Sequence, residues 1–94
     1  METITEQVEK FYKETGKKLE IKDGKPYYDG SLYLSYTAIT SLPDNLMVGN
    51  GSLDLCDTEI TSLPDNLVVG GSLYLYNTAI TSLPDTLVVG GYLN

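Results

Sequence analysis

The densest group of side chains capable of acid, base or nucleophilic chemistry lies in residues 54–59, where Asp54, Asp57 and Glu59 surround Cys56. Paired carboxylates can act as general acid and base, and clustered carboxylates can bind calcium. A calcium site needs more oxygen ligands with a turn glycine among them, and acid–base catalysis needs a pocket that a shallow strand face does not supply. We therefore expect a solvated acidic patch, with no metal site, no cofactor and no catalytic residue.

The amino-acid composition excludes further classes of reaction. Histidine is absent, so no Ser-His or Cys-His nucleophile pair and no imidazole metal site can form. A single cysteine excludes an intramolecular disulfide and a cysteine-rich zinc cluster. No cation lies close to Cys56 in sequence to activate its thiol, so we expect it to be inert. The sequence predicts a protein that is not an enzyme.

Charge is unevenly distributed along the 94 residues, whose formal net charge is −7. All six basic residues are lysines within positions 10–25, whereas residues 26–94 contain seven acidic residues and no basic one. Such a chain is repelled by nucleic acid and anionic membranes and attracts basic protein surfaces. No apolar stretch is long enough to span a membrane, and the acidic start does not have the form of a signal peptide. We expect a cytoplasmic protein.

Internal repeats organise residues 30–94. The pattern Gly-Ser-Leu-x-Leu begins at Gly30, Gly51 and Gly71, and Ile-Thr-Ser-Leu-Pro-Asp begins nine residues after each of them. This divides the chain into repeats 30–50, 51–70 and 71–90 and a partial fourth repeat, 91–94. In each copy the alternating leucines predict a short strand with one buried face, and the proline predicts a turn. Val88-Val89 predicts a second short extended segment.

The skeleton L-x-L-x-x-T-x-I-x-x-L-P-x-x-L resembles the leucine-rich repeat, in the short form of bacterial effectors and of repeat proteins from gut bacteria and their phages. Where the family has an asparagine ladder, this chain has Thr37, Thr58 and Thr78, whose hydroxyls can still bond to nearby backbone. The resemblance implies an α/β repeat solenoid with one parallel strand per repeat on its concave side. The core would then comprise Leu32, Leu34, Ile39, Leu42, Leu46, their equivalents in the two later copies, and Val48, Val69 and Val89.

Residues 1–29 are predicted to cap this array with a helix and a hairpin. Thr3 and Glu6 have the spacing of a capping box, and Gly16 is placed to end a helix over about residues 4–15. Asp23-Gly24 predicts a turn between two strands. The helix is expected to present one apolar face of Ile4, Val8, Phe11 and Tyr12. Its lysines are matched by glutamates, which argues against a membrane-binding helix.

Differences among the three copies concentrate at the non-core positions of the predicted strand and its exit, which is the face that leucine-rich repeats use for binding. The candidate binding residues on this face are Tyr33, Tyr36, Asp54, Asp57, Tyr74 and Tyr76, with Tyr92 as a further candidate. Tyrosine offers a large contact area and loses little entropy on binding. Exposed tyrosines also favour strands by cross-strand stacking, and drift after duplication would also make the copies differ, so both alternatives stay open.

These features predict a non-enzymatic interaction module that binds a basic protein through a tyrosine-rich, acidic strand face. One alternative is a small phage or bacterial inhibitor that acts as an acidic decoy for a nucleic-acid-binding protein. Another is a structural fragment of a longer repeat protein. The last repeat has no coil beyond it and exposes a strand edge, so we also expect a homodimer through residues 80–94, centred on Tyr92 and Leu93.

Overall fold

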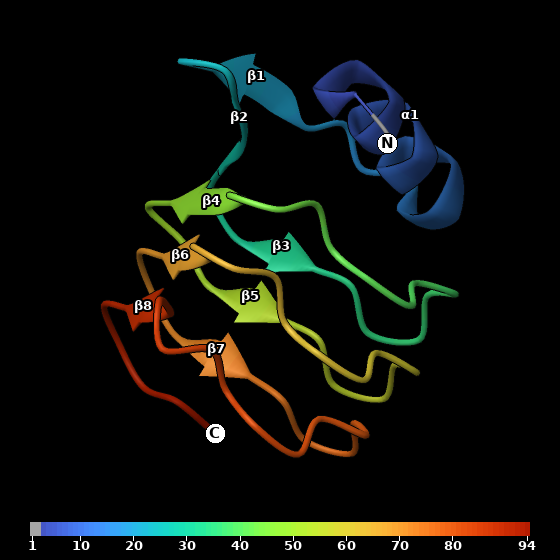
Figure 1. The fold of residues 1–94 in the computed structure, drawn as a ribbon. Coiled ribbons are helices and arrows are strands. Elements are labelled where there is room, and N and C mark those ends of the chain that lie inside the picture. Colours follow the sequence, from blue (N-terminus) through green and yellow to red (C-terminus); the bar gives the residue numbers. More distant parts are fainter. Residues whose placement is uncertain (1–2) are drawn as a thin grey trace.

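One helix and eight short strands form the fold of residues 3–94, the part of the chain that the computed structural model describes (Figure 1). The strands make two sheets, a five-stranded one of order β1-β2-β4-β6-β8 and a three-stranded one of order β3-β5-β7. The chain is therefore a compact α/β domain, as predicted. The elements are α1 (Ile4–Thr15), β1 (Glu20–Lys22), β2 (Lys25–Asp29), β3 (Leu32–Tyr33), β4 (Met47–Gly49), β5 (Leu53–Asp54), β6 (Val68–Val69), β7 (Leu73–Tyr74) and β8 (Val88–Val89).

Helix α1 begins and ends where the sequence predicts, because both of its ends are capped. The Thr3 hydroxyl accepts the Glu6 N–H at 3.1 Å, and the Glu6 carboxylate accepts the Thr3 N–H at 3.3 Å. Gly16 adopts the left-handed conformation that closes the helix, with φ of 75°. On the predicted apolar face Phe11 is buried, whereas Tyr12 is 54% exposed. The helix covers only the first repeat, so a narrow stripe centred on Phe11 is enough to contact the core.

The predicted hairpin follows the helix and joins the five-stranded sheet. β1 and β2 pair antiparallel, and the turn residues Asp23 and Gly24 both have positive φ, 54° and 76°. Positive φ at both central residues is the geometry that matches the twist of a two-residue hairpin. β2 then pairs in parallel with β4. The hairpin thus connects the N-terminal part of the chain to the first repeat through backbone hydrogen bonds.

Each complete repeat contributes two strands, namely the expected parallel strand and the second extended segment that Val88-Val89 predicts. β3, β5 and β7 pair in parallel at equivalent leucines, and β4, β6 and β8 pair in parallel at equivalent valines. The physical reason is the repeat length. A period of 20 or 21 residues places every extended segment beside its own equivalent, so the valine segments also find backbone partners.

The core lies between the two sheets and the long loops, and the prediction of its members is confirmed for the first two repeats. The leucines and isoleucines of those copies, together with Val48 and Val69, are buried along with Phe11 and Leu19. In the third copy only Leu73 is fully buried, whereas Leu83 is 43% exposed. Leu75, Ile80, Leu87 and Val89 are partly buried. No described segment covers these residues from the C-terminal side.

The Gly-Ser pair of each repeat sets how closely consecutive copies approach. Serine Oγ atoms accept backbone N–H groups from the next copy, at 3.0 Å from Ser31 to Ser52, 3.0 Å from Ser52 to Ser72 and 2.9 Å from Ser72 to Tyr92. The preceding glycine allows this approach. A Cβ on Gly71 would lie 2.8 Å from the carbonyl carbon of Gly51, which is inside the distance that a real Cβ tolerates.

Two neighbouring glycines test this steric constraint. Neither Gly70 nor Gly71 has positive φ, so alanine is conformationally allowed at both and only space decides the outcome. A Cβ on Gly70 would meet its nearest atom at 3.0 Å, a looser contact than at Gly71. We expect Gly71→Ala to lower the free energy of unfolding by about 1–3 kcal/mol, as overpacking does, and Gly70→Ala to cost less. Urea denaturation measures both, and equal losses would contradict a constraint specific to Gly71.

Candidate protein-binding face

The outer face of β3, β5 and β7 aligns three of the predicted binding residues in one row. The strand register places Tyr33 beside Asp54, and Asp54 beside Tyr74. Because side chains alternate along a strand and the flanking leucines point into the core, these three point outward. Tyr33 is 61% exposed, and Asp54 and Tyr74 are half-buried. The result is a carboxylate between two phenol rings, held on adjacent strands.

A second row lies just beyond the strand ends and contains Tyr36, Asp57 and Asn77. All three have positive φ, of 62°, 60° and 58°, which ends each strand at the same position. Asn77 Nδ2 donates to Asp57 Oδ1 at 2.7 Å, and the Tyr36 hydroxyl also bonds to Asp57. Asn77 is not among the residues that the sequence predicts for this face. Asn77 could have been found from the sequence, because it occupies the same position in its copy as Tyr36 and Asp57. Asn and Asp also tolerate the left-handed conformation better than most residues.

The carboxylates of Asp54 and Asp57 have different neighbours, and each affects a pKa on this face. Partial burial raises the pKa of the Asp54 carboxyl, but hydrogen bonds from the Cys56 backbone N–H at 3.0 Å and from the Cys56 and Ser35 side chains outweigh it and leave this pKa below its ordinary value. Asp54 is therefore ionised at neutral pH. The hydrogen bond to Asp57 and its negative charge raise the pKa of the Tyr36 hydroxyl, which stays neutral. The face combines negative charge with neutral phenols.

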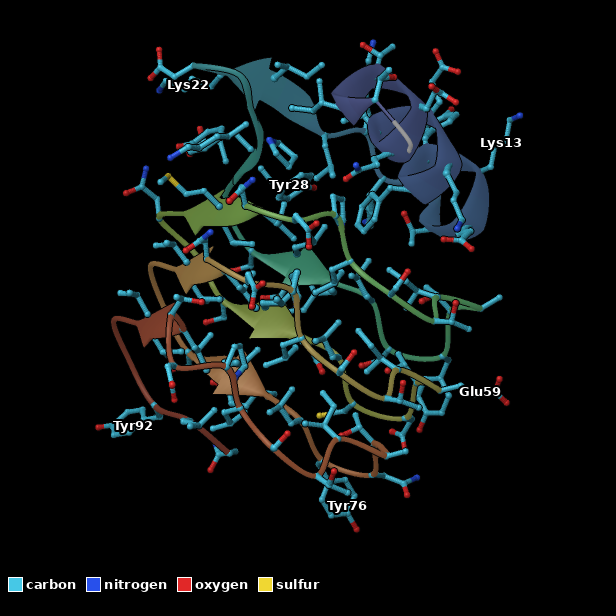
Figure 2. All side chains as sticks on the ribbon, in the orientation of Figure 1. Lys13, Lys22, Tyr28, Glu59, Tyr76 and Tyr92 are labelled. Carbon is cyan, nitrogen blue, oxygen red and sulfur yellow. The ribbon has the colours of Figure 1, made fainter. Side chains whose placement is uncertain are left out.

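Six of the predicted binding residues share this region, and Tyr92 does not. Tyr76 follows Tyr74 by two residues on the same outward side and is 76% exposed. Leu93 pairs with Leu73, which places Tyr92 beside Ser72 and Asn94 beside Tyr74. The fourth copy has tyrosine at the serine position, two residues before the outward strand position, which Asn94 occupies. Tyr92 and Tyr76 accordingly lie at separate corners of the C-terminal end (Figure 2).

Basic side chains are distant from this face. All six lysines fall in α1, β1, the adjoining turns and the first residue of β2, and Lys13 and Lys22 lie at the opposite end of the molecule from Tyr76 (Figure 2). Lys22 is instead held over the Tyr27 ring, with its Nζ 4.8 Å from the ring centroid. The charge of Asp54 and Asp57 is therefore available to a cation from outside the chain.

Two observations bear on other kinds of site. Within residues 3–94, acidic and cysteine side chains do not gather into a group of three or more that could hold a metal ion. The described part of the chain also contains no helix long and apolar enough to cross a membrane.

Comparison of the chain with protein-family models, curated proteins and solved structures finds no match. The geometry of the chain itself is therefore the basis for assigning a function.

The environment of Cys56 yields a test of the electrostatics of this face. Burial, the Asp54 carboxylate and the charge of Asp57 raise the pKa of the Cys56 thiol, although a backbone hydrogen bond from Tyr76 opposes them. Because only the thiolate reacts, alkylation at neutral pH should be slow and should accelerate as pH rises through this elevated pKa.

We expect Asp54→Asn to move the midpoint of the alkylation pH profile to lower pH, since it removes the nearest negative charge. Asp65→Asn is the matched control, because Asp65 is an exposed acid in the loop of the same repeat. The midpoint is measured by iodoacetamide labelling and mass spectrometry from pH 7 to 10. An unchanged midpoint in Asp54→Asn, or an equal shift in both variants, would contradict the assignment.

Proposed function

We propose that this chain is a leucine-rich-repeat-like interaction module that binds a basic protein segment across the outer face of β3, β5 and β7. The observation that carries the proposal is the row Tyr33–Asp54–Tyr74, in which an exposed ring and a half-buried ring flank one ionised carboxylate. Three adjacent strands hold these side chains in place, so little backbone ordering is required when a partner binds.

The spacing of the row suits one cationic group. Tyr33 and Tyr74 stand on strands separated by β5, which puts them roughly 10 Å apart at the ordinary strand spacing. A guanidinium or ammonium group fits between the two rings above Asp54, where it gains a charge contact and a contact with each aromatic face. Arginine is favoured over lysine, because its planar group can stack on a ring and still bond to a carboxylate.

The second row extends the surface for a longer segment. Asp57 lies three residues after Asp54, and Tyr36 and Tyr76 stand exposed beside it. An extended segment in the polyproline II conformation, which has three residues per turn, would place basic side chains three residues apart on one side, roughly 9 Å from each other and against the two acids. A partner with one basic residue would contact only the first row.

The proposed solenoid is supported by a contact that recurs at the same position in each copy. The threonine hydroxyls donate to the carbonyl three residues earlier, at 2.7 Å for Thr37, 2.7 Å for Thr58 and 2.9 Å for Thr78. These bonds satisfy the backbone where leucine-rich repeats use asparagine. They are consistent with a short variant of that architecture. They are also consistent with the array that the repeated sequence predicts.

The acidic-decoy alternative fits the charge distribution less well. Of the seven acids in residues 26–94, only Asp54 and Asp57 lie on the tyrosine face, whereas Asp44, Asp65 and Asp85 recur in the loops of successive copies. A mimic of nucleic acid needs dense charge along one surface. The charges here are few and spread over several sides.

A matched set of peptides tests the proposed face. We expect an extended peptide with two arginines three residues apart to bind, and its citrulline analogue, which has the same shape without the charge, to bind at least tenfold more weakly. The double variant Tyr33→Ala with Tyr74→Ala should lose at least tenfold in affinity, because both rings contact the cation. Isothermal titration calorimetry measures the dissociation constants.

Tyr12→Ala is the control for this experiment, since Tyr12 is an exposed tyrosine on α1, away from the face. It should leave peptide affinity unchanged. Unchanged peptide affinity in the double variant would contradict the proposal. A steep fall in affinity with rising salt that is the same for wild type and double variant would favour the decoy instead.

A further inference from the structure

The C-terminal end of the fold exposes an apolar surface. Leu83 and Leu93 are 43% and 47% exposed, whereas Leu42 and Leu63, the equivalents of Leu83, are only 7% and 8% exposed. A hollow of about 450 Å³ at this end is lined in part by Leu75, Ile80, Leu83 and Leu93. The third repeat therefore has the same apolar interior as the first two, but within residues 3–94 one side of it is not covered.

Both sheets also end here with unused backbone groups. The Val88 N–H donates to the Leu67 carbonyl at 3.0 Å, and the Gly90 N–H donates to the Val69 carbonyl at 2.8 Å, so the N–H and C=O of Val89 point to the opposite side. The Tyr92 carbonyl and the Asn94 N–H both bond to Leu73, at 2.8 Å and 3.0 Å, so those of Leu93 also point away from the sheet. Within residues 3–94, no strand pairs with β8 on that side.

The positions of these two residues are related through Gly91. Val89 lies two residues before it in one sheet, and Leu93 lies two residues after it beside the other sheet. A rotation of 180° about an axis through this corner places Val89 antiparallel to Leu93 of the partner subunit. Opposed residues of an antiparallel pair can exchange both hydrogen bonds. We propose that the chain forms a two-fold dimer in this way, with Val89 bonded to Leu93 of the partner subunit at two symmetric places.

The dimer would also close the open core, since the rotation brings the two apolar ends face to face. Leu75, Ile80, Leu83 and Leu87 of one copy then lie against the same residues of the other. An isologous contact of this kind is complete with two copies and leaves no open edge at this end.

The serine positions favour a second copy over a further coil stacked in parallel. Each of Ser31, Ser52 and Ser72 offers an Oγ that accepts an N–H from the next copy. The fourth position is Tyr92, which is 78% exposed and has no such oxygen beside its backbone. A further coil stacked in parallel would have no serine Oγ at position 92 to accept its backbone N–H. Antiparallel pairing with a second copy does not require this acceptor.

The charge distribution also selects this end for self-association. Between residues 78 and 94 the only charged side chain is Asp85, so two chains of net charge −7 meet with little repulsion. The free edge at the other end, β1, consists of the exposed residues Glu20, Ile21 and Lys22. Charged residues on an edge strand oppose pairing with another chain. A head-to-tail filament through β1 is accordingly disfavoured.

Sedimentation velocity over a wide range of protein concentration tests the dimer. We expect the mass to rise from one copy to two and no further. Leu93→Lys should raise the dissociation constant at least tenfold, because it introduces charge into the apolar contact. Thr61→Lys is the matched control, since it adds the same charge in an exposed loop of the middle repeat and should have no effect. A monomer at all concentrations, assemblies beyond two copies, or a dimer unaffected by Leu93→Lys would overturn the proposal.

Disulfide cross-linking tests the register independently. Opposed residues in an antiparallel pair are close enough for a disulfide. With Cys56→Ser in both, the single variants Val89→Cys and Leu93→Cys should each resist oxidation to a covalent dimer, whereas their mixture should cross-link readily. Far-ultraviolet circular dichroism and urea denaturation establish that each variant is folded. Efficient cross-linking of either variant alone, or none in the mixture while the dimer persists, would overturn the register.

Discussion

Every other feature of this structure depends on the close approach of each repeat to the one before it. The approach is possible because glycine backbone lies directly against glycine backbone, with no room for a Cβ at Gly71. It is then fixed by the serine hydroxyls, which accept backbone N–H groups across the same contact. Because the distance between consecutive repeats is fixed, each leucine packs against its equivalent in the next repeat. Each extended segment then pairs with its equivalent to form a strand. Displacement of one copy by a single residue would turn the leucines out of the core.

This constraint also explains where the copies can differ. Residues that point inward or bond to the next copy are confined by their own equivalents, so the glycines, serines, leucines and threonines at these positions recur unchanged in the three complete copies. Outward strand positions are free of that requirement, and they hold tyrosine in β3 and β7 and aspartate in β5. The inner pattern therefore does not fix the residues of this row, and the fold is compatible with its alternating rings and charge.

Much of the fold was predictable because its signals are local. The capping box at Thr3, the left-handed Gly16 and the Asp23-Gly24 turn each involve residues within a few positions, and all are confirmed. The second extended segment of each repeat was predicted from Val88-Val89, but its pairing into a sheet depends on the stacking of successive copies. Helical spacing predicts an apolar face for α1 but not how much of it is buried, and Tyr12 on that face is 54% exposed. The site was predictable as a set of positions, whereas the bond from Asn77 to Asp57 depends on the three-dimensional alignment of two copies.

The two proposed interfaces use different sides of the protein, and their geometry limits what a dimer could bind. An axis through Gly91 lies between the two sheets, so rotation places the partner's five-stranded sheet next to the three-stranded sheet of the first subunit. The two tyrosine faces then lie on opposite sides of the corner. One short basic segment cannot reach both of them. Dimerisation would raise affinity only for a partner with two basic segments joined by a linker long enough to pass around the molecule, or for partners arrayed on a surface.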